Sequence, residues 1–234
     1  MDNPVHTNAA SAVLAECHLF RMVDWQTIQS LAKEARLSVL HRGEMVSPCG
    51  SADRGFFLVK SGQVKLSIIS LSGAERVIDV VRSGETFGET TLFSDRCTKL
   101  HAQMLKDGEL LEIPRTSFNR AIGQSPHLAA SMLRYLSSKL CRLLDEVENC
   151  CLRTATQRVV DYLSLLAKEQ SADGAITIRL PTSKSVIASL LDLTPETFSR
   201  ELKRLNTMGL IEVGRKSVRI LDLQAMQRSV VKTS

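Results

Sequence analysis

The sequence predicts an α+β fold in three consecutive parts: an antiparallel β-roll, a long helix, and two short helices followed by a β-hairpin. Three observations carry this prediction. Glycines interrupt short apolar runs before Pro114, a seven-residue apolar repeat follows Pro126, and a polar turn separates two apolar-faced segments near Asp192. There is no strand–helix–strand alternation, which argues against a parallel sheet. We expect the parts to span residues 1–125, 126–151 and 152–234.

The composition is that of a globular protein with one large or two modest domains. The 234 residues are 44% hydrophobic and 24% charged, as in ordinary folded chains. No apolar stretch reaches the roughly 20 residues of a membrane helix, and residues 1–20 lack the basic flank of a signal peptide. The cysteines form no C-x-x-C pair, which favours reduced thiols. We therefore expect a cytoplasmic protein with no membrane partner. The six cysteines are Cys17, Cys49, Cys97, Cys141, Cys150 and Cys151.

The net charge of +5 is concentrated at one end of the chain. Residues 152–234 contain 13 Lys or Arg and 8 Asp or Glu, whereas residues 1–151 contain 17 of each kind. A positive excess confined to one part indicates a polyanionic partner for that part. A mildly basic solvated surface is the alternative.

The N-terminal half changes from helical to strand-like patterning. Residues 9–35 have the apolar periodicity of a helix. The runs Phe56–Val59 and Val77–Val81 each stop shortly before a glycine, and Val64–Ile68 alternates apolar and polar side chains. Short strands separated by glycine-bearing turns predict an antiparallel sandwich or roll.

The strongest periodic pattern begins after Pro126, a residue suited to the first turn of a helix. Apolar residues recur there at alternating spacings of four and three, which is the heptad of a self-pairing helix. An ordinary amphipathic helix packed on its own roll is the alternative. The repeat favours a homodimer whose interface contains Leu133, Leu136, Leu140, Leu143 and Val147. The full series is Ala129, Leu133, Leu136, Leu140, Leu143, Val147 and Cys150.

The C-terminal part predicts a helix over residues 152–169, a strand over 176–180, and a helix-turn-helix. Asp192 suits a turn because Asp tolerates the left-handed conformation. Thr194 and Pro195 suit the N-cap and first position of the second helix. We expect the first helix to bury Val186, Ile187, Leu190 and Leu191, and the second to bury Phe198, Leu202 and Leu205. A hairpin over residues 210–221, with basic residues at its tip, completes a winged helix-turn-helix.

The outer face of the second helix has the chemistry to recognise bases in a major groove. Arg200 can donate two hydrogen bonds to guanine, and Glu196 can accept from cytosine. Ser199 can donate or accept, while Lys203 and Arg204 can neutralise phosphates. The alternative is a solvated surface on which Glu196 and Arg200 form an i,i+4 pair.

The motif Pro195–Arg200, the heptad helix and the roll together resemble the CRP/FNR family of bacterial regulators over nearly the whole chain. Glu-x-x-Ser-Arg at this place is similar to the motif of the fumarate–nitrate (FNR) branch and of the dissimilatory nitrate respiration regulators. The latter sense nitric oxide through haem. The resemblance implies double-stranded DNA with TTGAT half-sites separated by four bases, TTGAT-N4-ATCAA, as the target. It implies base contacts from Glu196, Ser199 and Arg200, and phosphate contacts from Ser183, Lys184, Thr194, Thr197 and Lys203.

The same resemblance makes the roll similar to a cyclic nucleotide-binding domain. It implies an effector pocket formed by Gly88, Glu89, Lys99, Leu100, Leu143 and Leu144. Relatives that bind cyclic nucleotides carry an Arg-Ser pair in place of Lys99 and Leu100. They carry a Thr-Ser pair in place of Leu143 and Leu144. Leucines supply no donors to a phosphodiester, which argues against cyclic AMP. Lys99 keeps a cyclic-nucleotide-responsive regulator open as the alternative.

Two other signals follow from the resemblance. An iron–sulfur cluster of the family's type needs several N-terminal cysteines, and only Cys17 precedes the roll, which argues against one. Nitrate respiration regulators carry a histidine before Leu-Phe, as His18 stands here, so haem with His18 as axial ligand is a minority hypothesis. A surface or packing role for His18 carries more weight. The other histidines lack metal-ligand spacing.

Two other classes of function fit the sequence less well. A cyclic-nucleotide sensor whose C-terminal part is only structural leaves the recognition helix unexplained. A cupin-like metalloenzyme needs several roll histidines, and His101 alone lies deep in that region. Since nucleophile-elbow and phosphate-loop motifs are also missing, we expect no enzyme. We expect a homodimeric transcription regulator under allosteric control of its roll, with RNA polymerase as a partner and activation as the family tendency.

Overall fold

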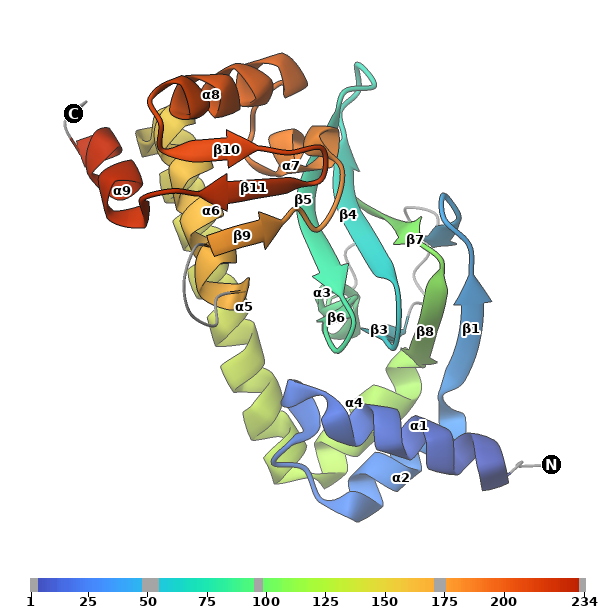
Figure 1. Ribbon diagram of the computed structural model, residues 1–234. Coiled ribbons are helices and arrows are strands. Elements are labelled where there is room, and N and C mark those ends of the chain that lie inside the picture. Colours follow the sequence, from blue (N-terminus) through green and yellow to red (C-terminus); the bar gives the residue numbers. More distant parts are fainter. Residues whose placement is uncertain (1–3, 48–54, 95–98, 171–175, 232–234) are drawn as a thin grey trace. The chain divides into compact units, whose positions relative to one another are not determined.

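The computed structural model describes residues 4–47, 55–94, 99–170 and 176–231, and leaves side chains 4–8, 47 and 231 undescribed. The chain forms two compact units, Met1–Cys141 and Arg142–Ser234. The predicted α+β class is confirmed: antiparallel sheets precede a long helix and a helix-turn-helix (Figure 1). Among the described residues, no helix combines the length and apolarity needed to cross a membrane.

In the first unit, helices precede and follow the strands along the chain, and one short helix lies between β6 and β7. The helices are α1 (Pro4–Glu16), the 3₁₀ helix η1 (His18–Phe20), α2 (Trp25–Glu34), α3 (Glu89–Leu92) and α4 (Arg115–Gln124). The strands are β1 (Arg36–Leu40), β2 (Met45–Ser47), β3 (Phe56–Val59), β4 (Gln63–Ile69), β5 (Glu75–Arg82), β6 (Thr86–Phe87), β7 (Leu100–Lys106) and β8 (Gly108–Ile113). Helix α5 (Pro126–Leu152) begins in this unit and ends in the second.

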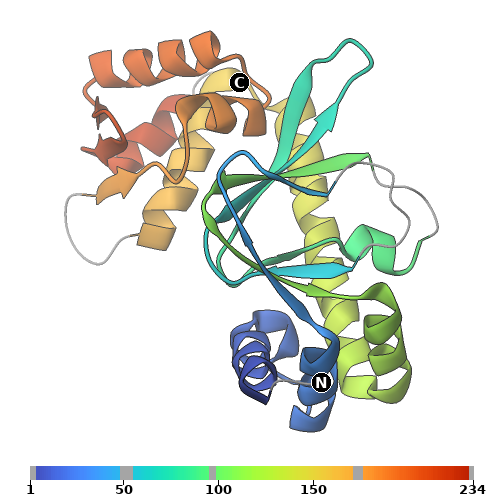
Figure 2. The ribbon, with the colours of Figure 1, turned by 90° about the vertical axis from the view of Figure 1, so that its right-hand side faces the viewer.

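Two four-stranded antiparallel sheets form the roll. One has the order β1-β8-β3-β6 and the other β2-β7-β4-β5. Figure 2 shows these strands with the N-terminal helices gathered at one end. The space between the sheets is filled by an apolar core in which the rings of Phe57 and Phe87 stack at 4.9 Å.

Strand β3 is buried on both faces, which explains its uninterrupted apolar sequence. Because side chains alternate along a strand, Phe57 and Val59 enter the core between the sheets, whereas Phe56 and Leu58 enter a second core beneath the helices. In that second core, the rings of Phe56 and Phe118 of α4 lie 4.9 Å apart. One strand therefore joins the roll to its helical layer.

The N-terminal helical prediction is correct in type but wrong in continuity. Residues 9–35 were expected to follow one helical period, yet η1 and a turn separate α1 from α2. Asp24 starts α2 as its N-cap, with Oδ1 accepting from the Thr27 amide at 2.8 Å. A cap satisfies an amide that a continuous helix would bond internally, so the chain bends here.

Helix α5 begins at Pro126, as predicted, and presents different side chains to two environments. Leu128 and Met132 are buried in the helical core of the first unit, and Leu136 is half-buried against it. Most of the heptad series points to solvent. Its exposed members are Leu133 (67%), Leu140 (59%), Leu143 (49%) and Val147 (59%). We call these four residues the α5 stripe.

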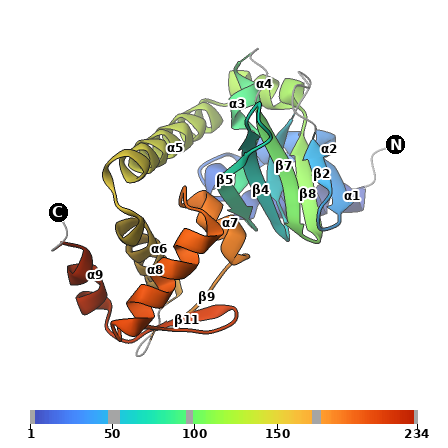
Figure 3. The same cartoon turned by 90° about the horizontal axis from the view of Figure 1, so that it is seen from above.

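The second unit has its own apolar core around α6 (Ala155–Gln170). A three-stranded sheet of order β10-β11-β9 packs with α7 (Lys184–Leu190), α8 (Pro195–Thr207) and α9 (Leu223–Val231) (Figure 3). The strands are β9 (Ile176–Arg179), β10 (Ile211–Val213) and β11 (Ser217–Ile220). The predicted strand over 176–180 and the hairpin over 210–221 are confirmed.

A pair of glycine substitutions tests the turn geometry of the roll. Gly62 and Gly73 both have left-handed backbones, with φ of +88° and +84°, but a Cβ on Gly62 would lie 2.8 Å from the Asp107 carbonyl oxygen while one on Gly73 meets nothing. Gly73→Ala should lower the free energy of unfolding by about 1–2 kcal/mol through backbone strain alone. Gly62→Ala should lower the free energy of unfolding by roughly 1–3 kcal/mol more than Gly73→Ala does, because its Cβ also clashes with the Asp107 carbonyl.

The single tryptophan, Trp25, lies in the same unit, so its fluorescence during urea unfolding reports both variants. Equal destabilisation by the two substitutions would contradict the packing described for Gly62.

Candidate nucleic-acid interface and effector pocket

The turn between α7 and α8 depends on one residue with an unusual backbone. Asp192 has φ of +55°, and it is the only non-glycine residue with positive φ in the described part of the chain. This confirms the prediction that Asp192 takes the place where glycine is common. The Leu193 amide then donates to the Ala188 carbonyl at 2.9 Å, which closes the turn.

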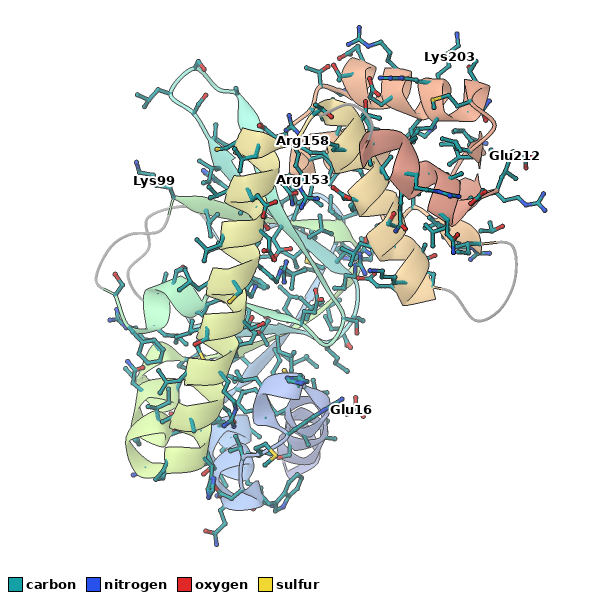
Figure 4. The ribbon with its side chains drawn as sticks, turned by 90° about the vertical axis from the view of Figure 1, so that its left-hand side faces the viewer. Glu16, Lys99, Arg153, Arg158, Lys203 and Glu212 are labelled. Atoms are coloured by element: carbon teal, nitrogen blue, oxygen red, sulfur yellow. The ribbon has the colours of Figure 1, made fainter. Side chains whose placement is uncertain are left out.

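Arg158 of α6 holds this turn from inside the unit. Its Nη1 donates to the carbonyl oxygens of Leu191 at 2.9 Å and Asp192 at 3.0 Å, and lies 3.5 Å from the Asp192 carboxylate. The Arg158 side chain is only 15% exposed (Figure 4). This role could not be predicted from the sequence, because Arg158 and the turn are far apart in the chain and share no periodic pattern.

Helix α8 begins as its sequence predicts. Thr194 is the N-cap, with its hydroxyl accepting from the Thr197 amide at 3.2 Å, and Pro195 takes the first helical position. Phe198, Leu202 and Leu205 are buried in the unit's core, also as predicted. The first helix buries less than expected, since Ile187 is fully buried whereas Val186, Leu190 and Leu191 are half-buried.

The four candidate base-reading and basic side chains share the outer face of α8. Glu196, Ser199, Arg200 and Lys203 are all exposed, and Figure 4 shows Lys203 extending away from the unit. Arg200 Nη2 donates to the Thr197 hydroxyl at 3.2 Å, and no ion pair joins Arg200 to Glu196 within the described residues. The guanidinium is therefore held by one exposed neutral contact, which a base edge can replace.

Four of the five candidate phosphate-binding residues lie at the starts of α7 and α8, and Lys203 lies further along α8. Ser183 caps α7 and is exposed, as is Thr194, whereas Lys184 and Thr197 are half-buried. Hydroxyls and amides at helix starts suit an anion, because they donate from the positive end of the helix dipole.

Arg204, a candidate phosphate ligand, also contacts residues of its own unit. Its Nη1 donates to the Thr156 hydroxyl at 3.2 Å and lies 3.8 Å from Glu201 Oε2, to which Thr156 donates at 2.8 Å. This network ties α8 to the start of α6. Periodicity could not reveal it, because Thr156 comes from another helix.

Glu89 of the predicted effector pocket forms an ion pair with a lysine of α5, Lys139. Glu89, which follows the left-handed Gly88 at the start of α3, has a side chain that is 12% exposed. Its Oε1 lies 3.4 Å from Lys139 Nζ of α5, which also lies 3.5 Å from Asp79 of β5. Glu89 Oε2 is buried and finds no hydrogen-bond partner within the described residues.

Tyr135, one turn before Lys139, completes this cluster. Its hydroxyl lies 2.8 Å from the Thr86 hydroxyl and donates to the Thr86 carbonyl at 3.2 Å. Burial first, and then the charge of Glu89, raise the pKa of Tyr135 to about 12, so the phenol stays neutral. Sequence analysis missed Lys139, Tyr135 and Asp79.

The other predicted pocket residues are less closely associated. Lys99 is exposed and Leu100 is half-buried at the start of β7. Leu143 and Leu144 are exposed and belong to the second unit, so their place beside the roll stays a prediction.

The residues do not fit the hypothetical haem site. His18 begins η1 with its side chain exposed, and it is Leu19 and Phe20 that enter the core. Haem needs an axial ligand directed into an apolar cavity. Nor does the described chain gather three His, Cys, Asp or Glu side chains in a metal-binding arrangement.

Comparison with known proteins gives matches in both units. Residues 37–125 match the model of the cyclic nucleotide-binding domain, and residues 157–229 match that of the Crp-like helix-turn-helix domain. The chain is 32% identical to the global nitrogen regulator of Nostoc sp. over 180 residues, which are 74% of this chain and 79% of the relative. It is 28% identical to the transcriptional activator protein FnrA of Stutzerimonas stutzeri over 206 residues, 86% and 82% of the two chains.

A solved structure shows the same fold. FixK2 from Bradyrhizobium japonicum superimposes with a TM-score of 0.72 over 83% of this chain and 96% of that chain, at 22% identity.

The Arg158 contacts give a testable prediction for the α7–α8 turn. Arg158→Met removes hydrogen bonds from a charged donor to carbonyls, each worth about 1.5–3 kcal/mol when buried. Amides of residues 188–194 should then exchange with solvent roughly ten- to a hundredfold faster, as measured by hydrogen–deuterium exchange. Arg219→Met is the matched control. The Arg219 side chain is half exposed, and its ion pair with Glu212, at 3.5 Å, lies in the β10–β11 hairpin rather than at the α7–α8 turn. Unchanged exchange in Arg158→Met would show that the turn does not depend on this side chain.

Proposed function

The chain belongs to the CRP/FNR family of transcription regulators, and we propose that two copies of it bind one palindrome, TTGAT-N4-ATCAA. The observation that carries this proposal is the outer face of α8. Glu196, Ser199 and Arg200 are exposed together on a capped helix whose opposite side is buried. Arginine recognises guanine through O6 and N7, and glutamate accepts from cytosine N4, so this set suits a half-site that contains a G·C pair.

Pairing through the α5 stripe supports the palindromic form of the target. A twofold dimer presents two copies of α8, and operators for such dimers place half-sites one DNA turn apart, about 34 Å. Lys203, together with Ser183, Lys184, Thr194 and Thr197, then contacts phosphates. In this proposal residues 1–125 sense a signal, residues 126–151 pair the subunits, residues 152–234 bind DNA, and RNA polymerase is the downstream partner.

We further propose that the signal is not cyclic AMP, and that it is a redox change or a small molecule. The support lies in the charge around Glu89. Lys139 lies against Glu89 and Asp79, so the ammonium is already neutralised by two carboxylates. A phosphodiester placed in this cluster would meet the two carboxylates that already flank Lys139, and Leu100 offers it no side-chain donor.

The reading face is tested by a pair of substitutions on α8. Arg200→Ala should weaken binding to the palindrome by about 1–3 kcal/mol and relax discrimination at one base pair of each half-site. Lys203→Ala should weaken binding to all sequences alike and lower the salt dependence by about one charge. Fluorescence anisotropy with labelled duplexes at several salt concentrations measures both effects.

Each variant is the control for the other, since both side chains are exposed on the same helix. Retention of full base discrimination by Arg200→Ala would show that α8 does not recognise the half-site through this residue.

A further inference from the structure

The heptad series along α5 ends in a thiol rather than in an aliphatic side chain. Alternating spacings of four and three lead from Leu143 to Val147 and then to Cys150. Cys150 lies in the last turn of α5, which ends at Leu152. It therefore takes the position at which the next leucine or valine of the α5 stripe would stand.

Two other cysteines of α5 lie on different faces. In a helix with 3.5 residues per turn, Cys141 is about 130° from the centre of the heptad seam and Cys151 is about 75° from it. Both side chains are exposed, whereas Cys150 is half-buried. If exposure selects the thiol that is oxidised, it is Cys141 or Cys151. If the heptad position selects it, it is Cys150, so an experiment can separate the two explanations.

The spacing of paired helices fits a disulfide at this position. Helix axes pack about 8–10 Å apart, and each Cα lies about 2.3 Å from its own axis. Two Cα atoms that face each other across the seam are therefore about 3.5–5.5 Å apart at closest approach. This range overlaps the separation of about 4.4–6.8 Å that a disulfide requires. The end of a helix also adjusts more easily than its middle.

We infer that Cys150 of one subunit forms a reversible disulfide with Cys150 of the other, which makes the C-terminal end of the dimer helix an oxidation-sensitive site. The inference rests on the homodimer in the proposed function. Each thiol loses one proton and one electron as the S–S bond forms. A diazene oxidant such as diamide takes up both protons and both electrons at its N=N bond and becomes a hydrazine.

The contacts beyond Cys150 connect this site to the DNA-binding part of the same unit. Arg153 follows the end of α5, and its Nη2 lies 3.1 Å from Glu148 of α5. Its Nη1 forms an ion pair with Asp161 of α6, and Figure 4 labels Arg153 in this segment. A bond at Cys150 therefore acts on a segment that is tied by side chains to α6, the helix that carries Arg158.

The test uses the reduced full-length protein, treated with diamide and run on a denaturing gel without reductant. We expect a covalent dimer that dithiothreitol reverses, with the loss of one titratable thiol per chain. Cys150→Ser should abolish this dimer. Cys141→Ser and Cys151→Ser, which remove the more exposed thiols, should retain it.

Sedimentation of the untreated proteins separates failure of this inference from failure of the proposed dimer. A noncovalent dimer that yields no Cys150-dependent cross-link overturns the disulfide alone. A monomer overturns both proposals. Cross-linking that survives in Cys150→Ser and disappears in Cys141→Ser or Cys151→Ser shows that exposure, not the heptad, selects the thiol, and also overturns the inference. A monomeric product that loses two thiols indicates a bond within one chain, with the same consequence.

Discussion

The α5 stripe imposes the constraint on which our functional account depends. One side of α5 is already used, because Leu128 and Met132 are buried in the helical core beneath the roll. Leu133, Leu140, Leu143 and Val147 are left about half to two-thirds exposed to water, and burial of the remaining exposed surface of each is worth roughly 1–2 kcal/mol. In the proposed homodimer, a second copy of the same helix covers this row in heptad register. The symmetry of the proposed DNA target follows from that pairing, since a twofold dimer presents the same recognition helix twice.

Within the second unit, the cationic side chains divide into two roles. Arg158 and Arg204 are engaged by the protein itself, the first by the α7–α8 turn and the second by Thr156 and Glu201. Arg200 and Lys203 stand exposed on the opposite side of α8 from its buried residues. The basic excess of residues 152–234 is therefore not all available to DNA. Part of it fixes the helix from which the remaining cations project, and this gives the side chains that we propose to read the bases a rigid support.

Local chemistry was predictable from the sequence, whereas contacts between distant segments were not. Four features each depend on a few neighbouring residues: the cap at Thr194, the left-handed Asp192, the strand Phe56–Val59 and the start of α5. The break near Asp24 was missed because apolar periodicity continues across a cap. The Lys139–Glu89 pair joins residues from different elements, and no alternation or spacing marks such a pair. The site residues were therefore named from motif position, while the side chains that hold them emerged only from the folded chain.

The spacing between half-sites tests most directly whether a symmetric dimer binds DNA with two recognition helices. Binding of the protein is measured to two duplexes, one with TTGAT-N4-ATCAA and one with five further base pairs between the half-sites. Five base pairs are about half a turn of DNA, so the second half-site moves to the opposite side of the duplex. Our account predicts that affinity for the longer duplex falls to that for a single half-site. Equal affinity for the two duplexes would contradict a rigid dimer with two recognition helices one turn apart.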